Sequence, residues 1–480
     1  MSEGYDILIA GGTVIDGTGT PRQAADVGIR GDRIVAVGKL ATAEAREIVD
    51  ATGLIVAPGF IDAHTHDDRA VLSGPDMTMK ISQGVTTVIS GNCGVSLAPF
   101  PADRDPPPPL NLLGGRDWYR FRSFADYIAA LEAAPASLNI APQVGHTTLR
   151  AAVMDNVFRP AAPEEIDAMA DMVDEAMQAG AIGLSTGLFY PPAQAAPTDE
   201  VVVLAERAAR AGGMHTTHMR DEGPQVLDSI RESAEIGERA KLPVVISHHK
   251  CAGRPNWGRS VDTLALIDTV RRKQALDIDV YPYIASSTVL LPARIKDAER
   301  VMVTWSRSHP EMNGRDLADV AREWSCTVEE AAERLQPAGA VYWQMQEDDL
   351  RRILSWPDSM IGSDGLPHDD VPHPRLWGTF PRVLGHYSRD EKLFSLEQAV
   401  RKMTSIAARV FGLAGRGSIV EGSFADLALF DAETVLDEAT FEQPKRPARG
   451  IRRVVVNGAT VWSDGKWSGA KPGRVLRRAV

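Results

Sequence analysis

The stretch "FIDAHTHDD", from Phe60 to Asp68, ends an apolar run with two histidines one residue apart and acids beside them. Alternate side chains of a β-strand share a face, so His64 and His66 would lie side by side, as in a chelate. Later apolar runs end in further candidate ligands, at Cys93, His218 and His248. A lone histidine is more often a hydrogen-bonded structural residue than a ligand. These residues therefore predict a metal site only if one fold brings them together.

Two other residues have both a structural and a chemical interpretation. Cys93, in "SGNCG", is either a buried structural cysteine or a thiolate ligand, which zinc binds well. Asp364, in "GSDG", is either a turn residue or a carboxylate that transfers protons at a metal site. For Asp364 the position at the end of the eighth strand favours the chemical interpretation, whereas for Cys93 the residues alone leave both interpretations open.

The middle of the chain predicts a fold that would gather these residues. Apolar runs alternate with amphipathic helical stretches, such as residues 163–180 and 224–242, and eight of the runs have the length and composition of strands. Eight strand–helix units predict an α/β fold with a closed parallel (β/α)8 barrel. In such a barrel all strand C-termini face one mouth, where active sites are built.

The two ends of the chain show a different pattern. Short period-two segments broken by turn residues fill residues 5–56 and return after residue 417, which predicts short antiparallel strands. We therefore expect a small β-sandwich domain formed from residues 1–57 and 415–480, with the barrel over 58–414. A segment from about 285 to 341 is too long for a connection, so we expect an insertion that acts as a lid. The Pro-rich stretch 104–115 is expected to extend over the barrel mouth.

Composition limits the kind of partner. A formal net charge of -12 without a Lys/Arg-rich block argues against nucleic acid. No apolar run approaches the roughly 20 residues of a membrane helix, and no signal peptide is evident. Three cysteines are too few for a disulfide framework and indicate a reducing compartment, the cytoplasm. We expect a small-molecule substrate; the oligomeric state stays open.

The order His-x-His, His, His, Asp resembles the metal-binding pattern of the amidohydrolase superfamily along nearly the whole chain. One departure is informative, since strand four, "GAIGLSTGLFY", has neither the lysine nor the glutamate that bridges two metals in many members. With Cys93 present, the chain resembles the D-aminoacylases, also called N-acyl-D-amino-acid deacylases. The segments that carry this resemblance are "ISQGVTTVISGNCGVSLAP", "HMRDEG", "VVISHHK", "NWGRS", "YPY", "MIGSDGLPHDD" and "PHPRLWGTF".

The resemblance implies roles for individual residues. It implies one tightly bound zinc ion held by Cys93, His218 and His248, and a second, weaker position at His64, His66 and Asp364. Asp364 would be the general base and acid. The α-carboxylate of the substrate would contact Lys250, Tyr281 and Arg375, and Arg294 is a candidate for a side-chain pocket.

The expected reaction is zinc-dependent hydrolysis of N-acyl-D-amino acids to a carboxylate and a free D-amino acid. We expect hydrophobic D-side chains such as Met, Leu and Phe; the D preference comes from the resemblance alone. The alternatives are an N-acyl-D-glutamate or N-acyl-D-aspartate deacylase, a cyclic-amide hydrolase of the hydantoinase or dihydroorotase kind, and an inactive scaffold.

Overall fold

Eight parallel strands form the centre of the computed structural model, which describes residues 4–40, 45–100 and 103–479. They belong to two sheets in the order β10-β9-β8 and β11-β12-β13-β14-β15-β19. The strands are β8 (Phe60–Asp62), β9 (Val85–Ser90), β10 (Asn139–Pro142) with its continuation β11 (Val144–Gly145), β12 (Gly183–Gly187), β13 (Met214–His218), β14 (Val244–Ile246), β15 (Leu276–Val280) and β19 (Met360–Ile361).

The two sheets join into one closed barrel. Only Gln143 separates β10 from β11, so they are one strand that pairs with β9 on one side and with β12 on the other. At the other junction the Ala63 amide donates to the Ile361 carbonyl at 3.1 Å, and Thr65 forms a parallel bridge with Gly365. The predicted α/β barrel is confirmed.

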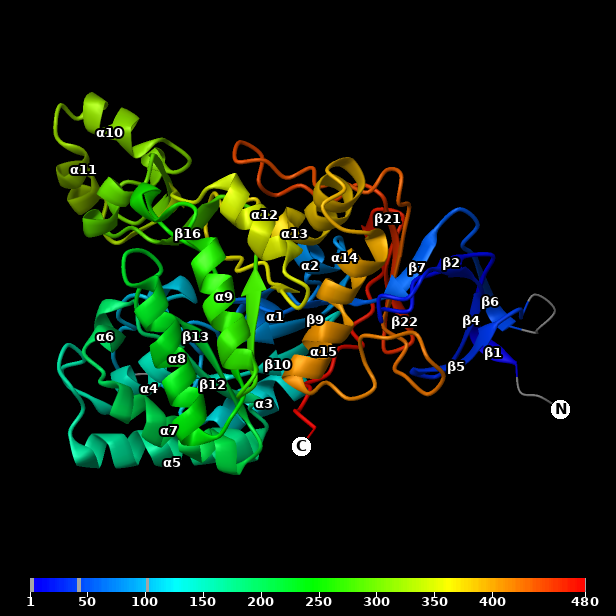
Figure 1. Ribbon diagram of the computed structural model, residues 1–480, viewed down its shortest axis with the longest axis horizontal. Helices are drawn as coiled ribbons and strands as arrows, with labels where there is room; N and C mark the ends of the chain where they lie inside the picture. Colours follow the sequence, from blue (N-terminus) through cyan, green and yellow to red (C-terminus); the bar gives the residue numbers. More distant parts are fainter. Residues whose placement is uncertain (1–3, 41–44, 101–102, 480) are drawn as a thin grey trace.

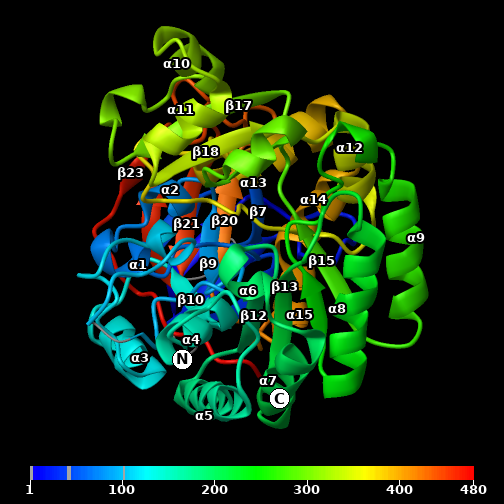
Figure 2. The same ribbon diagram turned by 90° about the vertical axis from the view of Figure 1, so that its left-hand side faces the viewer.

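Helices surround the strands (Figure 1; Figure 2). In α8 (Val226–Ala240) the buried residues Val226, Ile230 and Ile236 recur at helical spacing, so one face packs on the barrel while Arg231 and Arg239 face solvent. The other helices around the barrel are α1 (Ala70–Ser73), α2 (Thr78–Ile81), α3 (Phe124–Ala133), α4 (His146–Val153), α5 (Pro163–Ala179), α6 (Pro191–Gln194), α7 (Thr198–Arg210), α9 (Ser260–Arg271), α12 (Glu347–Ser355), α13 (Arg375–Arg382), the π-helix η5 (Val383–Asp390), α14 (Leu396–Met403) and α15 (Ser405–Phe411).

Both ends of the chain contribute to a pair of facing sheets beside the barrel, at the right of Figure 1. One sheet has the order β5-β4-β1-β6 and the other β23-β22-β21-β20-β7-β2-β3. Ile9 and Ile29 of the first sheet pack with Val56 and Leu427 of the second in one apolar core. The strands are β1 (Tyr5–Ala10), β2 (Thr13–Val14), β3 (Gln23–Ala24), β4 (Asp26–Arg30), β5 (Arg33–Gly38), β6 (Ala45–Asp50), β7 (Ile55–Pro58), β20 (Leu427–Phe430), β21 (Ile451–Val456), β22 (Ala459–Ser463) and β23 (Lys466–Trp467).

The strands of this sandwich are not all antiparallel, which corrects the expectation from the sequence. β4 pairs antiparallel with β1 and β5, but β1 pairs parallel with β6 and β2 pairs parallel with β7. Period-two alternation reports which side of a strand is buried and contains no information on the direction of its neighbour.

The segment after β15 forms a small unit of its own, at the upper left of Figure 1. Strands β16 (Ala285–Val289), β18 (Ala338–Trp343) and β17 (Arg300–Ser306) form an antiparallel sheet, covered by α10 (Leu317–Glu323) and α11 (Val328–Leu335). Val303, Leu317 and Leu335 belong to a separate apolar core. The domain boundaries expected from the sequence stay predictions.

Across the described ranges, no helix combines the length and apolar character needed to cross a membrane.

Candidate metal centre

The candidate ligands lie at the C-terminal ends of the barrel strands. His218 is the last residue of β13, and His248 and Cys93 lie two and three residues beyond the ends of β14 and β9. His64 and His66 follow β8, and Asp364 follows β19. All six side chains are buried. Because parallel strands end at one mouth, residues 300 positions apart in the chain become neighbours.

The backbone at three of these residues adopts a conformation that non-glycine residues rarely occupy. The φ angles are 55° at Cys93, 37° at His248 and 49° at Asp364, all in the left-handed region. Such a conformation costs on the order of 1–3 kcal/mol, and it turns each side chain away from the direction that the strand would give it. Left-handed non-glycine residues concentrate at functional sites, which supports a chemical role for this mouth.

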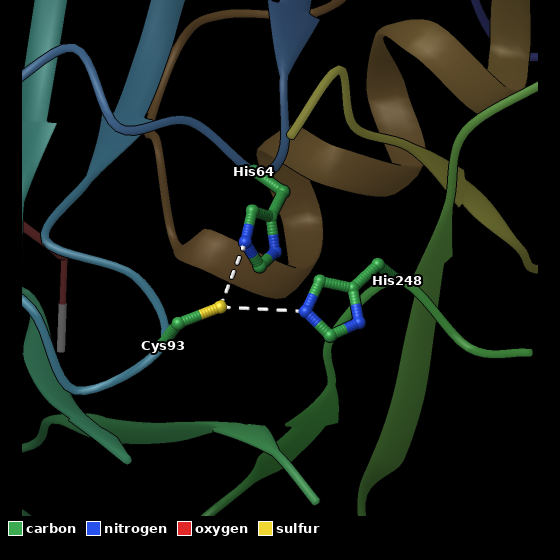
Figure 3. A group of neighbouring side chains, drawn as sticks. All are labelled: His64, Cys93 and His248. Atoms are coloured by element: carbon green, nitrogen blue, oxygen red, sulfur yellow. Dashed lines mark hydrogen bonds between the residues drawn. The ribbon is translucent and has the colours of Figure 1, made fainter. Parts of the chain in front are cut away.

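Short distances connect five of these side chains. Cys93 Sγ lies 3.3 Å from His64 Nε2 and 3.3 Å from His248 Nε2 (Figure 3). Asp364 Oδ1 lies 3.2 Å from His66 Nε2 and 3.5 Å from His64 Nε2. His64 therefore belongs to two groups of possible ligands, one with Cys93 and His248 and one with His66 and Asp364.

His218 lies in a third group, with His248 and Glu222. Its ring packs 4.4 Å from the His248 ring and stacks on Phe189 at 4.8 Å. Within the described part of the chain, neither ring nitrogen of His218 has a hydrogen-bond partner. Cys93 and His218 do not share one of these groups, in which all ligand atoms lie within 4.8 Å of one another; the third member beside Cys93 and His248 is His64. The set Cys93, His218 and His248 thus stays a prediction, with two of its three members in contact.

The electrostatics of these residues fit a cation. Burial lowers the pKa of His64 to about 3 and the pKa of His218 well below its usual value, so both imidazoles are neutral, the form that binds metals. Burial raises the pKa of the Cys93 thiol well above its usual value, and a thiolate therefore needs a metal beside it. A sulfur donor, neutral imidazoles and unpaired buried ring nitrogens fit a zinc ion.

Asp364 is held ionised. Burial alone would raise the pKa of this carboxyl, but the Arg375 guanidinium, with Nη2 2.9 Å from Oδ2, and the nearby histidines hold it well below its usual range. The expected contact of Arg375 with the substrate stays a prediction. The structure places Arg375 behind Asp364, fully buried, where it also donates to the Ser287 carbonyl at 3.0 Å.

A pocket opens beside the candidate ligands, and Lys250, Tyr281 and Arg294 line it. Arg375 is not part of its lining; its guanidinium carbon lies 4.5 Å from the centre of the Tyr281 ring. Arg294 lies over the Phe189 ring, 4.6 Å from its centre. The apolar part of the wall consists of Leu112, Phe189, Leu291 and Leu366. The insertion contributes Ser286, Ser287 and Thr288, and the residues directly after it contribute Tyr342 and Gln344.

Sequence reasoning missed two buried acids at this site. Glu222 Oε1 accepts from Lys250 Nζ at 2.7 Å, and Asp279 Oδ1 accepts from the His248 amide at 2.8 Å. Burial alone would raise the pKa of Glu222, but Lys250 and the two neighbouring histidines hold it well below its usual range. Asp279 had a signal, since it precedes Tyr281 by two residues and so shares its strand face. For Glu222 the only signal in the sequence was its position four residues after His218.

The barrel, its ligand-bearing mouth and the buried carboxylate define a metal-dependent hydrolase. The model of the Amidohydrolase family matches residues 47–274 and 313–462, and the chain therefore belongs to that family. It is 55% identical, over 100% of its own length and 99% of the relative's, to the D-aminoacylase of Alcaligenes xylosoxydans xylosoxydans. The resemblance to the D-aminoacylases is thus confirmed.

Two solved structures are similar over the whole chain. A crystal structure of D-aminoacylase, 53% identical, superposes with a TM-score of 0.97, covering 99% of this chain and 100% of that one. The N-acyl-D-glutamate deacylase of Bordetella bronchiseptica, complexed with zinc and a phosphonate inhibitor that mimics the tetrahedral intermediate, is 47% identical with a TM-score of 0.95 and the same coverage.

Proposed function

We propose that this enzyme hydrolyses N-acyl-D-amino acids to a carboxylate and a free D-amino acid, using zinc. The observation that carries the proposal is the contact of Cys93 with two histidines, next to an ionised Asp364 and beside a pocket that Lys250 and Tyr281 line. The zinc complex of the D-glutamate deacylase supports the choice of metal.

Two positions for a metal follow from the donor sets. Cys93 and His248, with His218 beside them, would hold the tight zinc ion, and His64, His66 and Asp364 the weaker one. A zinc ion held there would polarise the amide carbonyl and lower the pKa of the attacking water toward ~7.

Asp364 moves the proton in the proposed reaction. Its carboxylate takes a proton from the water that attacks the amide carbon, and a C–O bond forms. It then gives that proton to the nitrogen as the C–N bond breaks, so the D-amino acid leaves as an amine. Arg375 keeps Asp364 ionised before attack. His66, 3.2 Å from Asp364, is in place to donate to the carbonyl oxygen as charge develops there.

The α-carboxylate of the substrate would be bound by Lys250, Tyr281 and Arg375, of which the first two line the pocket. An ammonium beside a hydroxyl supplies the donors that a carboxylate requires. The Arg375 guanidinium lies 4.5 Å from the centre of the Tyr281 ring, and within the described ranges its Nε and Nη1 have no hydrogen-bond partner, which supports Arg375 as the third contact.

The apolar wall supports hydrophobic D-side chains. Leu112, Phe189, Leu291 and Leu366 face the pocket, and a Met, Leu or Phe side chain would bury its surface against them. Arg294 favours the second candidate, a D-glutamate or D-aspartate substrate, because its guanidinium lines the same pocket and its nearest acid, Asp297, lies 3.8 Å away. A bound carboxylate would be a closer partner.

The remaining expectations join this proposal. Residues 285–341 would act as a lid, since they contribute to the pocket wall while retaining their own core. Limited proteolysis of this segment should slow when an inhibitor is bound; equal rates would contradict a lid. The substrate is a small molecule, and three free cysteines support a reducing compartment such as the cytoplasm.

The test is kcat/KM of the zinc-loaded enzyme on matched N-acetyl D- and L-forms of Met, Leu, Glu and Asp, with metal content measured in the same samples. Methionine or leucine fastest, with D far above L, supports the first candidate. Glutamate fastest supports the second candidate and makes Arg294→Leu the next variant. No hydrolysis of any of these compounds by zinc-loaded protein would reject the deacylase function.

A further inference from the structure

Glu222 is a buried carboxylate that the proposed reaction does not use. It lies four residues beyond His218, in the loop before α8, and its side chain is 3% exposed. The Glu222 carbonyl accepts from the Ala252 amide at 2.7 Å, which fixes this loop to the segment that follows β14. That segment includes His248 and Lys250. Glu222 is therefore held between a candidate metal ligand and a candidate substrate contact.

Its carboxylate contacts both. Oε1 lies 3.0 Å from His248 Nδ1 and 2.7 Å from Lys250 Nζ, and Oε2 lies 3.6 Å from His218 Nε2. The opposite ring nitrogen of His248, Nε2, faces Cys93 Sγ at 3.3 Å. A metal ion on Nε2 would require the proton on Nδ1, and Glu222 Oε1, 3.0 Å away, is then its acceptor. Lys250 Nζ lies 2.7 Å from both atoms, and with Nδ1 protonated it donates to Oε1 and not to Nδ1. A carboxylate on the far nitrogen is the usual way in which a protein fixes a metal-binding histidine.

Glu222 could instead be a ligand, since its carboxylate groups with His218 and His248. The position of Lys250 argues against this, because its ammonium already lies 2.7 Å from both Glu222 Oε1 and His248 Nδ1. A divalent cation between these atoms would meet a positive charge at contact distance. The pattern fits a carboxylate that supports a ligand from behind.

We propose that Glu222 is a positioning residue that fixes His248 with Nε2 toward the metal and, through the same oxygen, fixes Lys250 toward the substrate carboxylate. This inference rests on the proposed function for the role of Lys250. One carboxylate would then connect metal affinity to substrate affinity. Removing the Glu222 carboxylate should weaken both metal and substrate binding, whereas removing the Lys250 ammonium should weaken only substrate binding.

The first experiment needs no substrate. Zinc affinity is measured by competition with a chromogenic chelator for wild type, Glu222→Gln, Lys250→Met and a matched control, Glu232→Gln. The control neutralises a partly buried carboxylate on α8 that pairs with Arg220. We expect Glu222→Gln to weaken zinc binding about 10–100-fold and the other two variants to stay within about twofold of wild type. Cobalt in Glu222→Gln should still show a thiolate-to-metal absorption band, because Cys93 remains a ligand.

Either of two results would overturn the proposal. Wild-type zinc affinity in Glu222→Gln would show that His248 does not need the carboxylate, and loss as complete as in His248→Ala would make Glu222 a ligand. If Glu222→Gln does not fold, Glu222→Asp retains the charge but withdraws it by one methylene, and it should show a smaller loss of the same kind. A raised KM in both Glu222→Gln and Lys250→Met supports the proposal that Glu222 fixes Lys250 toward the substrate carboxylate. An unchanged KM in Glu222→Gln refutes that part of the proposal. Because zinc affinity is read without turnover, failure of the deacylase function would leave that result intact.

Discussion

Lys80 connects two strands of the barrel from below the candidate metal centre, and we expect its loss to destabilise the enzyme. Its side chain is fully buried on α2, and Nζ donates to Asp62 Oδ2 at 2.8 Å and to Ser363 Oγ at 2.7 Å. Asp67 Oδ2 lies 3.3 Å away. Asp62 Oδ1 in turn accepts from the Ser363 amide at 2.7 Å. The ammonium thus holds the strand that carries His64 against the strand that carries Asp364.

Lys80→Met fits the same space but leaves two buried carboxylates without their cation. Removing one partner of a buried ion pair costs about 3–5 kcal/mol. For a chain of 480 residues, an unfolding entropy of about 2.1 cal/mol/K per residue gives about 1 kcal/mol per degree. We therefore expect the Tm to fall by about 3–5 °C.

A second buried lysine supplies the control. Lys402 donates to the Trp356 carbonyl and to Ser359 Oγ, neither of which is charged. Lys402→Met should therefore lower the Tm by about 1–3 °C, the cost of an unpaired acceptor. Differential scanning calorimetry of both variants is the assay, and Lys80→Met/Asp62→Asn should recover part of the loss. A fall in Tm for Lys80→Met no larger than that for Lys402→Met would refute the reasoning.

Three further predictions concern proton and metal binding. Burial lowers the pKa of Lys402 to about 7, while the unfolded chain keeps its proton up to about pH 10.4. Between these values the unfolded state binds more protons, so the Tm of wild type should rise relative to that of Lys402→Met from pH 7 to 10, and parallel Tm–pH curves would contradict this. Asp364→Asn should retain zinc but lower kcat by about 10²–10⁴-fold, and a near wild-type rate would remove Asp364 from the mechanism. Cys93→Ala should lose zinc on dialysis together with activity; unchanged zinc content would exclude Cys93 as a ligand.

Local patterns were enough to predict the fold. Strand and helix differ in the spacing of their apolar residues, and eight alternations with polar strand ends leave little choice but a barrel with one active mouth. The same reasoning failed for strand direction in the sandwich, where β1 and β6 pair parallel. Direction depends on the connections between strands, which the alternation does not record.

The sequence by itself determined which residues could do chemistry and that they would meet: His64 and His66 by their spacing, Cys93, His218, His248 and Asp364 by their positions at strand ends. Only the tertiary structure decided the partners. It placed His64 beside Cys93, Arg375 behind Asp364, and Glu222 between His248 and Lys250. The physical reason is that such contacts depend on a few ångströms between different strands. Those distances are set by left-handed turns at Cys93, His248 and Asp364 and by the packing of each loop, which no spacing within one segment encodes.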